Sequence, residues 1–152
     1  MSLRDRFTAE LKTAMMAKDA PRVSTLRMIT SKLKDTDIAA RPSGVDKVAD
    51  DAILQMLRGM AKSRRESVLL YRQGNREELA AKEETEIAVI ESFLPQQMDA
   101  DSLAAAVDAA IASSGAASVK EMGKVMAALR ATHGAALDMA AAGAVVKAKL
   151  GG

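Results

Sequence analysis

Apolar residues recur every three or four positions along most of this chain, and that spacing constrains the fold more than any other feature of the sequence. Residues three or four places apart lie on one face of an α-helix, so such a stripe predicts an amphipathic helix. Aromatic residues make up only 2% of the chain, and most of the abundant residue types favour helices over strands. We therefore expect an all-α protein.

Caps and helix breakers divide the chain into seven expected helices. Ser2, Asp19, Asp99 and Asp138 are candidate N-caps, and capping boxes are expected to begin at Asn75 and Ser118. The expected helices cover, to within a few residues, 2–18, 21–40, 50–73, 75–94, 99–113, 118–132 and 138–150.

The expected domain boundary lies at Pro95, which disfavours helical geometry at Leu94. The composition changes there too: residues 1–94 contain 17 Lys and Arg with 15 Asp and Glu, whereas residues 95–152 contain five of each group. We interpret 1–94 as an N-terminal four-helix domain and 95–152 as a small C-terminal three-helix domain. The hinge between them would consist of Leu94, Pro95, Gln96 and Gln97.

Several functional classes are disfavoured by what the sequence lacks. Without cysteine there are no disulfides or thiolate metal sites, which suits a reducing cytoplasm. The single histidine, His133, argues against His-pair metal sites and most Ser-His dyads. No apolar run approaches the ~18 residues of a membrane span, and the first residues do not resemble a signal peptide. We expect a cytoplasmic location with no cofactor, no metal and no membrane insertion.

Four basic residues line one face of the third expected helix at spacings of four, three and seven: Arg58, Lys62, Arg65 and Arg72. Such a row can bind phosphate groups and release their counterions. The alternative is a solvated charged face. No aromatic residue interleaves the row to stack on bases, which argues against recognition of single strands.

Arg64 instead falls on the apolar stripe of the same helix. If this helix and the next form an antiparallel hairpin, Arg64 lies opposite Glu83, Glu84 and Glu86, so we predict an interhelical ion pair or network with Arg64 or Arg65. Acid–base catalysis by these carboxylates is the weaker alternative, because each has a basic neighbour that keeps it ionised.

The second domain has its own basic candidates. These are Lys120, Lys124 and Arg130 on one expected helix, Lys147 on the last, and the connection His133–Gly134 between the two helices. A short loop flanked by basic residues can contact a phosphate backbone. The alternative is a plain turn with a solvent-facing histidine.

Four ordered segments carry a family resemblance: "TLRMITSKLKD" (25–35), "KSRRES" (62–67), "KEETEIAVIESFLPQQM" (82–98) and "SVKEMGKVMAAL" (118–129). Together they resemble the YqeY-like, or GatB/YqeY, family over nearly the whole chain. The resemblance implies a larger helical N-terminal domain and a three-helix C-terminal domain. It also implies a link to tRNA. A related module forms the C-terminal tail of GatB, a subunit of the tRNA-dependent amidotransferase, and similar modules are appended to some glutaminyl-tRNA synthetases.

The family pattern also bears on single residues. Lys120 and Lys124 match it, as do Gly134 and Asp138 after the "MGKVM" helix. The basic residues that usually flank the glycine are replaced here by His133 and Ala135.

Three functions follow as hypotheses. The first is a non-catalytic module that binds tRNA in aminoacyl-tRNA synthesis or tRNA-dependent amidotransferase pathways. The second is an adaptor that docks a synthetase or an amidotransferase. The third, by family association only, is a carbon–nitrogen ligase with glutamine as amido donor, although no catalytic constellation is visible in the sequence.

Overall fold

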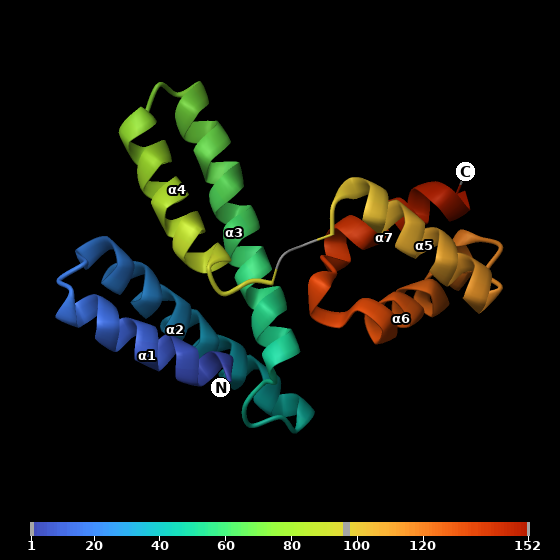
Figure 1. The fold of residues 1–152 in the computed structure, drawn as a ribbon, viewed down its shortest axis with the longest axis horizontal. Helices are drawn as coiled ribbons and strands as arrows, with labels where there is room; N and C mark the ends of the chain where they lie inside the picture. The colour runs from blue at the N-terminus through green and yellow to red at the C-terminus, as the bar shows by residue number, and fades with distance from the viewer. Residues whose placement is uncertain (1, 96–97, 152) are drawn as a thin grey trace. The chain divides into compact units, whose positions relative to one another are not determined.

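The computed structural model describes residues 2–95 and 98–151. Within these ranges the backbone forms seven α-helices and three 3₁₀ turns, with no β-strand. The all-α prediction is therefore confirmed. The chain divides into two compact units, Met1–Leu94 and Pro95–Gly152 (Figure 1).

The first unit consists of two helical hairpins. In one, α1 (Leu3–Met16) packs against α2 (Ala20–Ala40), and in the other α3 (Asp50–Gln73) packs against α4 (Glu77–Glu91). A 3₁₀ turn, η1 (Arg41–Ser43), follows α2 on the way to α3. Figure 1 shows that the two hairpins diverge toward their loops.

Two of the three caps expected in this unit form. The Ser2 hydroxyl accepts a hydrogen bond from the Asp5 N–H, and the Asp19 carboxylate accepts one from the Arg22 N–H, both at 3.2 Å. The capping box expected at Asn75 is wrong, because α4 begins two residues later without a side-chain cap. Asn75 instead adopts a φ of 58°, a left-handed conformation that asparagine tolerates and that closes the turn after α3.

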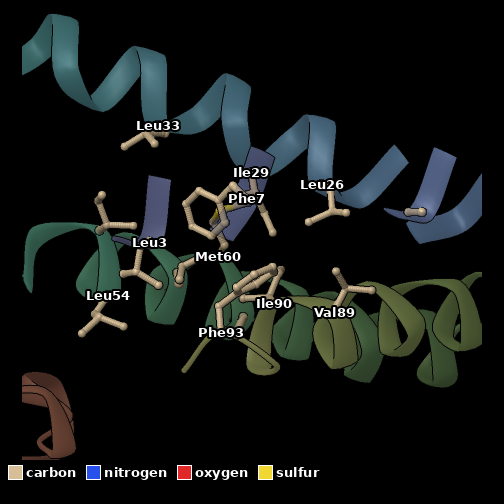
Figure 2. Packing of buried hydrophobic residues seen from close by; sticks show 14 residues of the cluster. Leu3, Phe7, Leu26, Ile29, Leu33, Leu54, Met60, Val89, Ile90 and Phe93 are labelled. Atoms are coloured by element: carbon tan, nitrogen blue, oxygen red, sulfur yellow. The ribbon is translucent and has the colours of Figure 1, made fainter. Parts of the chain in front are cut away.

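The core of the first unit lies between the hairpins. Figure 2 shows Leu26 and Ile29 of α2 facing Val89 and Ile90 of α4, with Phe7 of α1 beside them. Ile29 and Ile90 are fully buried. Leu26 and Ile29 lie three residues apart and therefore share one face of α2, so helical spacing contributes to the core as well as to the helix.

The two phenylalanines of the chain meet in this core. The ring centroids of Phe7 and Phe93 are 4.9 Å apart in an edge-to-face arrangement, and the Arg6 guanidinium lies 5.1 Å from the Phe93 centroid. Phe93 lies beyond α4 and is only 3% exposed. The last residues of the unit therefore pack back onto α1.

A carboxylate ties the start of α1 to the end of α2. The two Asp37 oxygens accept hydrogen bonds from Arg4 at 2.7 and 2.9 Å, and one of them also accepts the Val48 N–H at 2.9 Å. Arg4 donates in turn to the Val48 carbonyl at 2.8 Å. Arg4, and then the Val48 N–H, hold the pKa of Asp37 at about 2, below its usual 3.8.

This contact predicts an acid sensitivity of the first unit. The Asp37 pKa is about 2 when folded and 3.8 without its partners, so the stabilisation is complete at higher pH and is lost as pH falls between these values. Between these two pH values, unfolding of the wild-type protein should take up roughly one more proton than unfolding of the Asp37→Asn or Arg4→Met variant. Urea titrations followed by the fluorescence of Tyr71, the single tyrosine, measure this difference. Equal pH dependence in all three proteins would contradict the assignment.

The second unit contains three helices: α5 (Ala100–Ser114), α6 (Met122–His133) and α7 (Met139–Gly151). The 3₁₀ turn η2 (Val119–Glu121) precedes α6, and η3 (Gly134–Ala136) precedes α7. Its core is built from small and branched side chains. The most deeply buried are Val107, Val125, Leu129, Leu137, Ala142 and Val146.

Two acidic caps begin helices in this unit. Asp99 accepts the Ser102 N–H at 2.7 Å, a hydrogen bond that lowers the pKa of Asp99, and Asp138 accepts two N–H groups of the first turn of α7 at 3.0 and 3.2 Å. The capping box expected at Ser118 is wrong, since the Ser118 side chain caps nothing. Its carbonyl instead accepts the Glu121 N–H at 3.0 Å and starts η2.

The predicted hinge falls only partly within the described residues. The Leu94 N–H donates to the Glu91 carbonyl at 3.0 Å, and the Leu94 side chain packs against the core of the first unit. Pro95 is exposed. Gln96 and Gln97 lie outside the described residues, so the hinge stays a prediction.

Hydropathy gives no single helix among the described residues that could cross a membrane. Only α5 taken together with residues 119–133 reaches the required length and composition, as a pair bent by 89°.

Candidate nucleic-acid interface

The first residue of the basic row predicted on α3 is buried. Arg58 is only 7% exposed, so the prediction that it belongs to an exposed row is wrong. The reason is its place on the helix: Arg58 lies four residues after Leu54 and three before Ala61, and both neighbours are buried in the core. Lys62, the next member, is exposed.

The other two members of the row contact acidic residues of α4. Arg65 forms an ion pair with Glu91, and Arg72 contacts both Glu77 and Glu84. The hydrogen bond with Arg72 lowers the pKa of Glu77. These carboxylates neutralise most of the positive charge that would attract a phosphate group, so this face of α3 is a weak binding site for anions.

Arg64 lies where three helices of the first unit meet. Its Nε donates to Glu86 of α4 at 3.0 Å, another nitrogen donates to the Met60 carbonyl at 3.3 Å, and a third lies 3.6 Å from the Met28 sulfur of α2. The Arg64 and Glu86 side chains are only 16% and 14% exposed. Glu83 takes part in none of the ion pairs found within the described residues.

The second unit presents cations that carboxylates leave free. Lys149 forms an ion pair with Asp108 at 2.8 Å. The Lys124 ammonium nitrogen lies farther from its acidic neighbour, 4.0 Å from a carboxylate oxygen of Glu121. Lys120 and Lys147 are exposed, and in residues 98–151 no carboxylate forms an ion pair with either. Asp99 and Asp138 accept backbone N–H groups at the starts of helices, and neither forms an ion pair with Lys120 or Lys147 among the described residues.

The end of α7 packs against η2, the turn that contains Lys120. Gly151 follows Lys147 by one turn on the same face, and a Cβ on Gly151 would lie only 3.1 Å from Cγ2 of Val119. Lys120 is the next residue after Val119, and Lys124 lies in the first turn of α6. We call Lys120, Lys124 and Lys147 the basic cluster.

The remaining predicted residues lie at the other end of α6. Arg130 is exposed, but it follows Lys124 by six residues, or about 9 Å along the helix axis. His133 is half-buried and ends the helix. Gly134 has φ 50° and ψ −119°, a backbone conformation open almost only to glycine, which explains the residue by geometry. The structure therefore separates these three residues from the basic cluster.

A metal centre finds no support in the described ranges. Nowhere in residues 2–95 and 98–151 do three His, Asp or Glu side chains come together as a metal would require.

Sequence comparison identifies the family. The chain matches the Yqey-like protein family over residues 4–150. This match covers almost the whole chain and includes both units, so the chain belongs to the Yqey-like family.

Individual relatives are more distant. The chain is similar to proteins named altered inheritance of mitochondria protein 41, mitochondrial. The Vanderwaltozyma polyspora protein is 34% identical over 97 residues, which are 59% of this chain and 51% of the relative. The Eremothecium gossypii protein is 31% identical over 102 residues, 66% of this chain and 54% of the relative. The chain thus spans about half the length of the curated relatives it matches.

These names correct one expectation. The cytoplasmic location expected from the lack of cysteine is wrong by this comparison, because the relatives, including the Saccharomyces cerevisiae protein, are named as mitochondrial. A chain without cysteine is compatible with a reducing compartment, but the absence does not distinguish one compartment from another.

Proposed function

We propose that this chain is a non-catalytic module that binds tRNA through the basic cluster of its second unit. One observation carries the proposal: Lys120 and Lys147 are exposed cations that the carboxylates of that unit leave free. Positive side chains of this kind bind the phosphate backbone and fix the position of the protein on the nucleic acid. The resemblance to the tail of GatB favours tRNA as the ligand.

The module acts beside an aminoacyl-tRNA synthetase or a tRNA-dependent amidotransferase, whose tRNA substrate it helps to hold. Residues 1–94 and 95–152 are separate domains of four and three helices, so the second can contact RNA while the first is free for other contacts.

Titration of the full chain with bulk tRNA between about 50 and about 200 mM salt tests the proposal. Binding should weaken as salt rises, with a log–log slope of about −3 if the three lysines of the basic cluster each contact one phosphate. Lys147→Gln should weaken binding several-fold and make the slope shallower by about 1.

Lys149→Gln is the matched control. It removes the same charge from the same helix, but Lys149 is already paired with Asp108 and lies two residues away, on the opposite side of α7. Its affinity and slope should stay close to those of the wild-type protein. Equal effects of the two substitutions, or binding that does not respond to salt, would exclude the basic cluster as the interface.

A further inference from the structure

An open groove runs along α2 in the first unit. Between α2 and α3 it has a volume of about 830 Å³, and a second depression of about 720 Å³ extends it toward the loop after α1. Both parts are lined by Met28 and Ser31, and together they follow α2 from Ala20 to Thr36. At 1.5 Å per residue this is about 24 Å, or roughly four turns of helix. We call it the α2 groove.

The apolar surface of the α2 groove is rich in methionine. Met15, Met28, Met56 and Met60 all line it. Met15 is 51% exposed, and Met28 and Met56 are half-buried. Flexible thioether side chains adapt to irregular apolar surfaces, and grooves that receive amphipathic helices often use them. This surface favours an apolar helix face over a phosphate backbone.

A glycine of α3, Gly59, leaves additional space in the α2 groove. It lies in the middle of α3 and lines the α2 groove. A Cβ on Gly59 would meet no neighbouring side chain or segment within 4 Å among the described residues, and its φ is not positive. Glycine destabilises a helix interior relative to alanine, so neither packing nor backbone geometry accounts for it. Its missing side chain leaves room for an occupant to approach the α3 backbone.

The edge of the α2 groove is positively charged. Lys18, Arg27 and Lys32 line it, and none of the three belongs to an ion pair in the part of the chain that the structure describes. Asp35 is the single acidic residue of the lining, and Arg64 at the floor is already paired. A partner with acidic residues would complement this charge.

We propose that the α2 groove docks an amphipathic helix of a partner protein. The helix is about four turns long, places its apolar face on the methionine surface, and directs Asp and Glu side chains toward Lys18, Arg27 and Lys32. This site lies in the first unit and goes beyond the RNA-binding proposal, since it uses other residues and another class of partner.

A peptide library tests the proposal without a known partner. The library contains helical peptides of about 18 residues, apolar at positions i, i+3, i+4 and i+7, with flanking positions that sample Asp, Glu, Lys, Arg and Ser. Selection against the full chain should enrich peptides with Asp and Glu at the flanking positions. The affinity of the best acidic peptide should exceed that of its Lys-substituted copy by at least about tenfold.

Two substitutions assign that binding to the groove. Gly59→Leu fills the space above α3 and should weaken peptide binding at least about tenfold while raising Tm, because leucine favours a helix more than glycine does. A loss of binding in a more stable protein cannot result from unfolding. Arg27→Glu should also weaken binding at least about tenfold, whereas Lys82→Glu, an exposed position on α4 that does not line the groove, should leave it unchanged.

Three outcomes of the peptide experiments would each overturn the proposal: no enriched peptide, enrichment of basic flanks, or acidic peptides that bind Gly59→Leu as tightly as the wild-type protein. Bulk tRNA is the second probe. If Arg27→Glu weakens tRNA binding and leaves peptide binding unchanged, the groove is an RNA surface and the helix assignment is wrong. The basic-cluster variant Lys147→Gln should retain full peptide affinity, so the two proposals can fail separately.

Discussion

Replacing Phe93 with alanine should lower the free energy of unfolding of the first unit by about 4 kcal/mol. Phe93 is 3% exposed and its ring lies edge-to-face against Phe7, so the substitution removes a large apolar surface and leaves a cavity between α1 and the end of α4. Urea unfolding followed by Tyr71 fluorescence isolates this unit, because the chain has no tryptophan and Tyr71 is on α3.

Two controls separate this packing from a general effect of substitution. Phe93→Leu keeps most of the buried volume and should cost about 1 kcal/mol. Leu69→Ala removes a side chain that is 63% exposed and should cost less than about 0.5 kcal/mol. A cost below about 1 kcal/mol for Phe93→Ala would mean that the residues between α4 and Pro95 do not close the core.

Removing Glu86 should produce the second large loss of stability. Glu86→Ala leaves the Arg64 guanidinium without its carboxylate at a site where both side chains are less than one-fifth exposed, and should cost about 2 kcal/mol. Arg64→Ala should cost a similar amount, since Arg64 also contacts α2 and the α3 backbone. In a double-mutant cycle, the two substitutions together should cost about 1–2 kcal/mol less than their sum.

Arg65 and Glu91 supply a matched pair for this cycle. They join the same two helices, but their side chains are 55% and 46% exposed, so water and salt screen the interaction. Their coupling energy should be about 0.5 kcal/mol or less. Equal coupling energies for the Arg64–Glu86 and Arg65–Glu91 pairs would show that burial does not strengthen the Arg64–Glu86 ion pair.

Local signals in the sequence were enough to locate most helices. Asp19, Asp99 and Asp138 begin helices as expected, because a capping bond joins residues two or three positions apart. Asn75 and Ser118 show the limit of such signals. Both begin a pattern typical of a capping box, but at each position the backbone takes a tight turn that satisfies the N–H groups by another route.

The candidate sites depended more on tertiary contacts. A spacing of three and four residues indicated that Arg64 faces the next helix. It could not show that Arg58 is buried, because burial depends on how the hairpins pack together. The Arg4–Asp37 contact joins residues 33 positions apart and carries no periodic signal. The α2 groove is likewise lined by helices from both hairpins.

The helical class, the family and the residues that can carry charge can be read from the amino-acid sequence alone. These properties depend on composition, on short-range order and on ordered motifs along the chain. Which cations remain free depends on the packing of the helices. Arg65 and Arg72 form ion pairs with carboxylates of α4, whereas no carboxylate among the described residues of the second unit pairs with Lys120 or Lys147. An ion pair forms only between charges a few ångströms apart, and two residues at that distance in the fold are often far apart in the sequence.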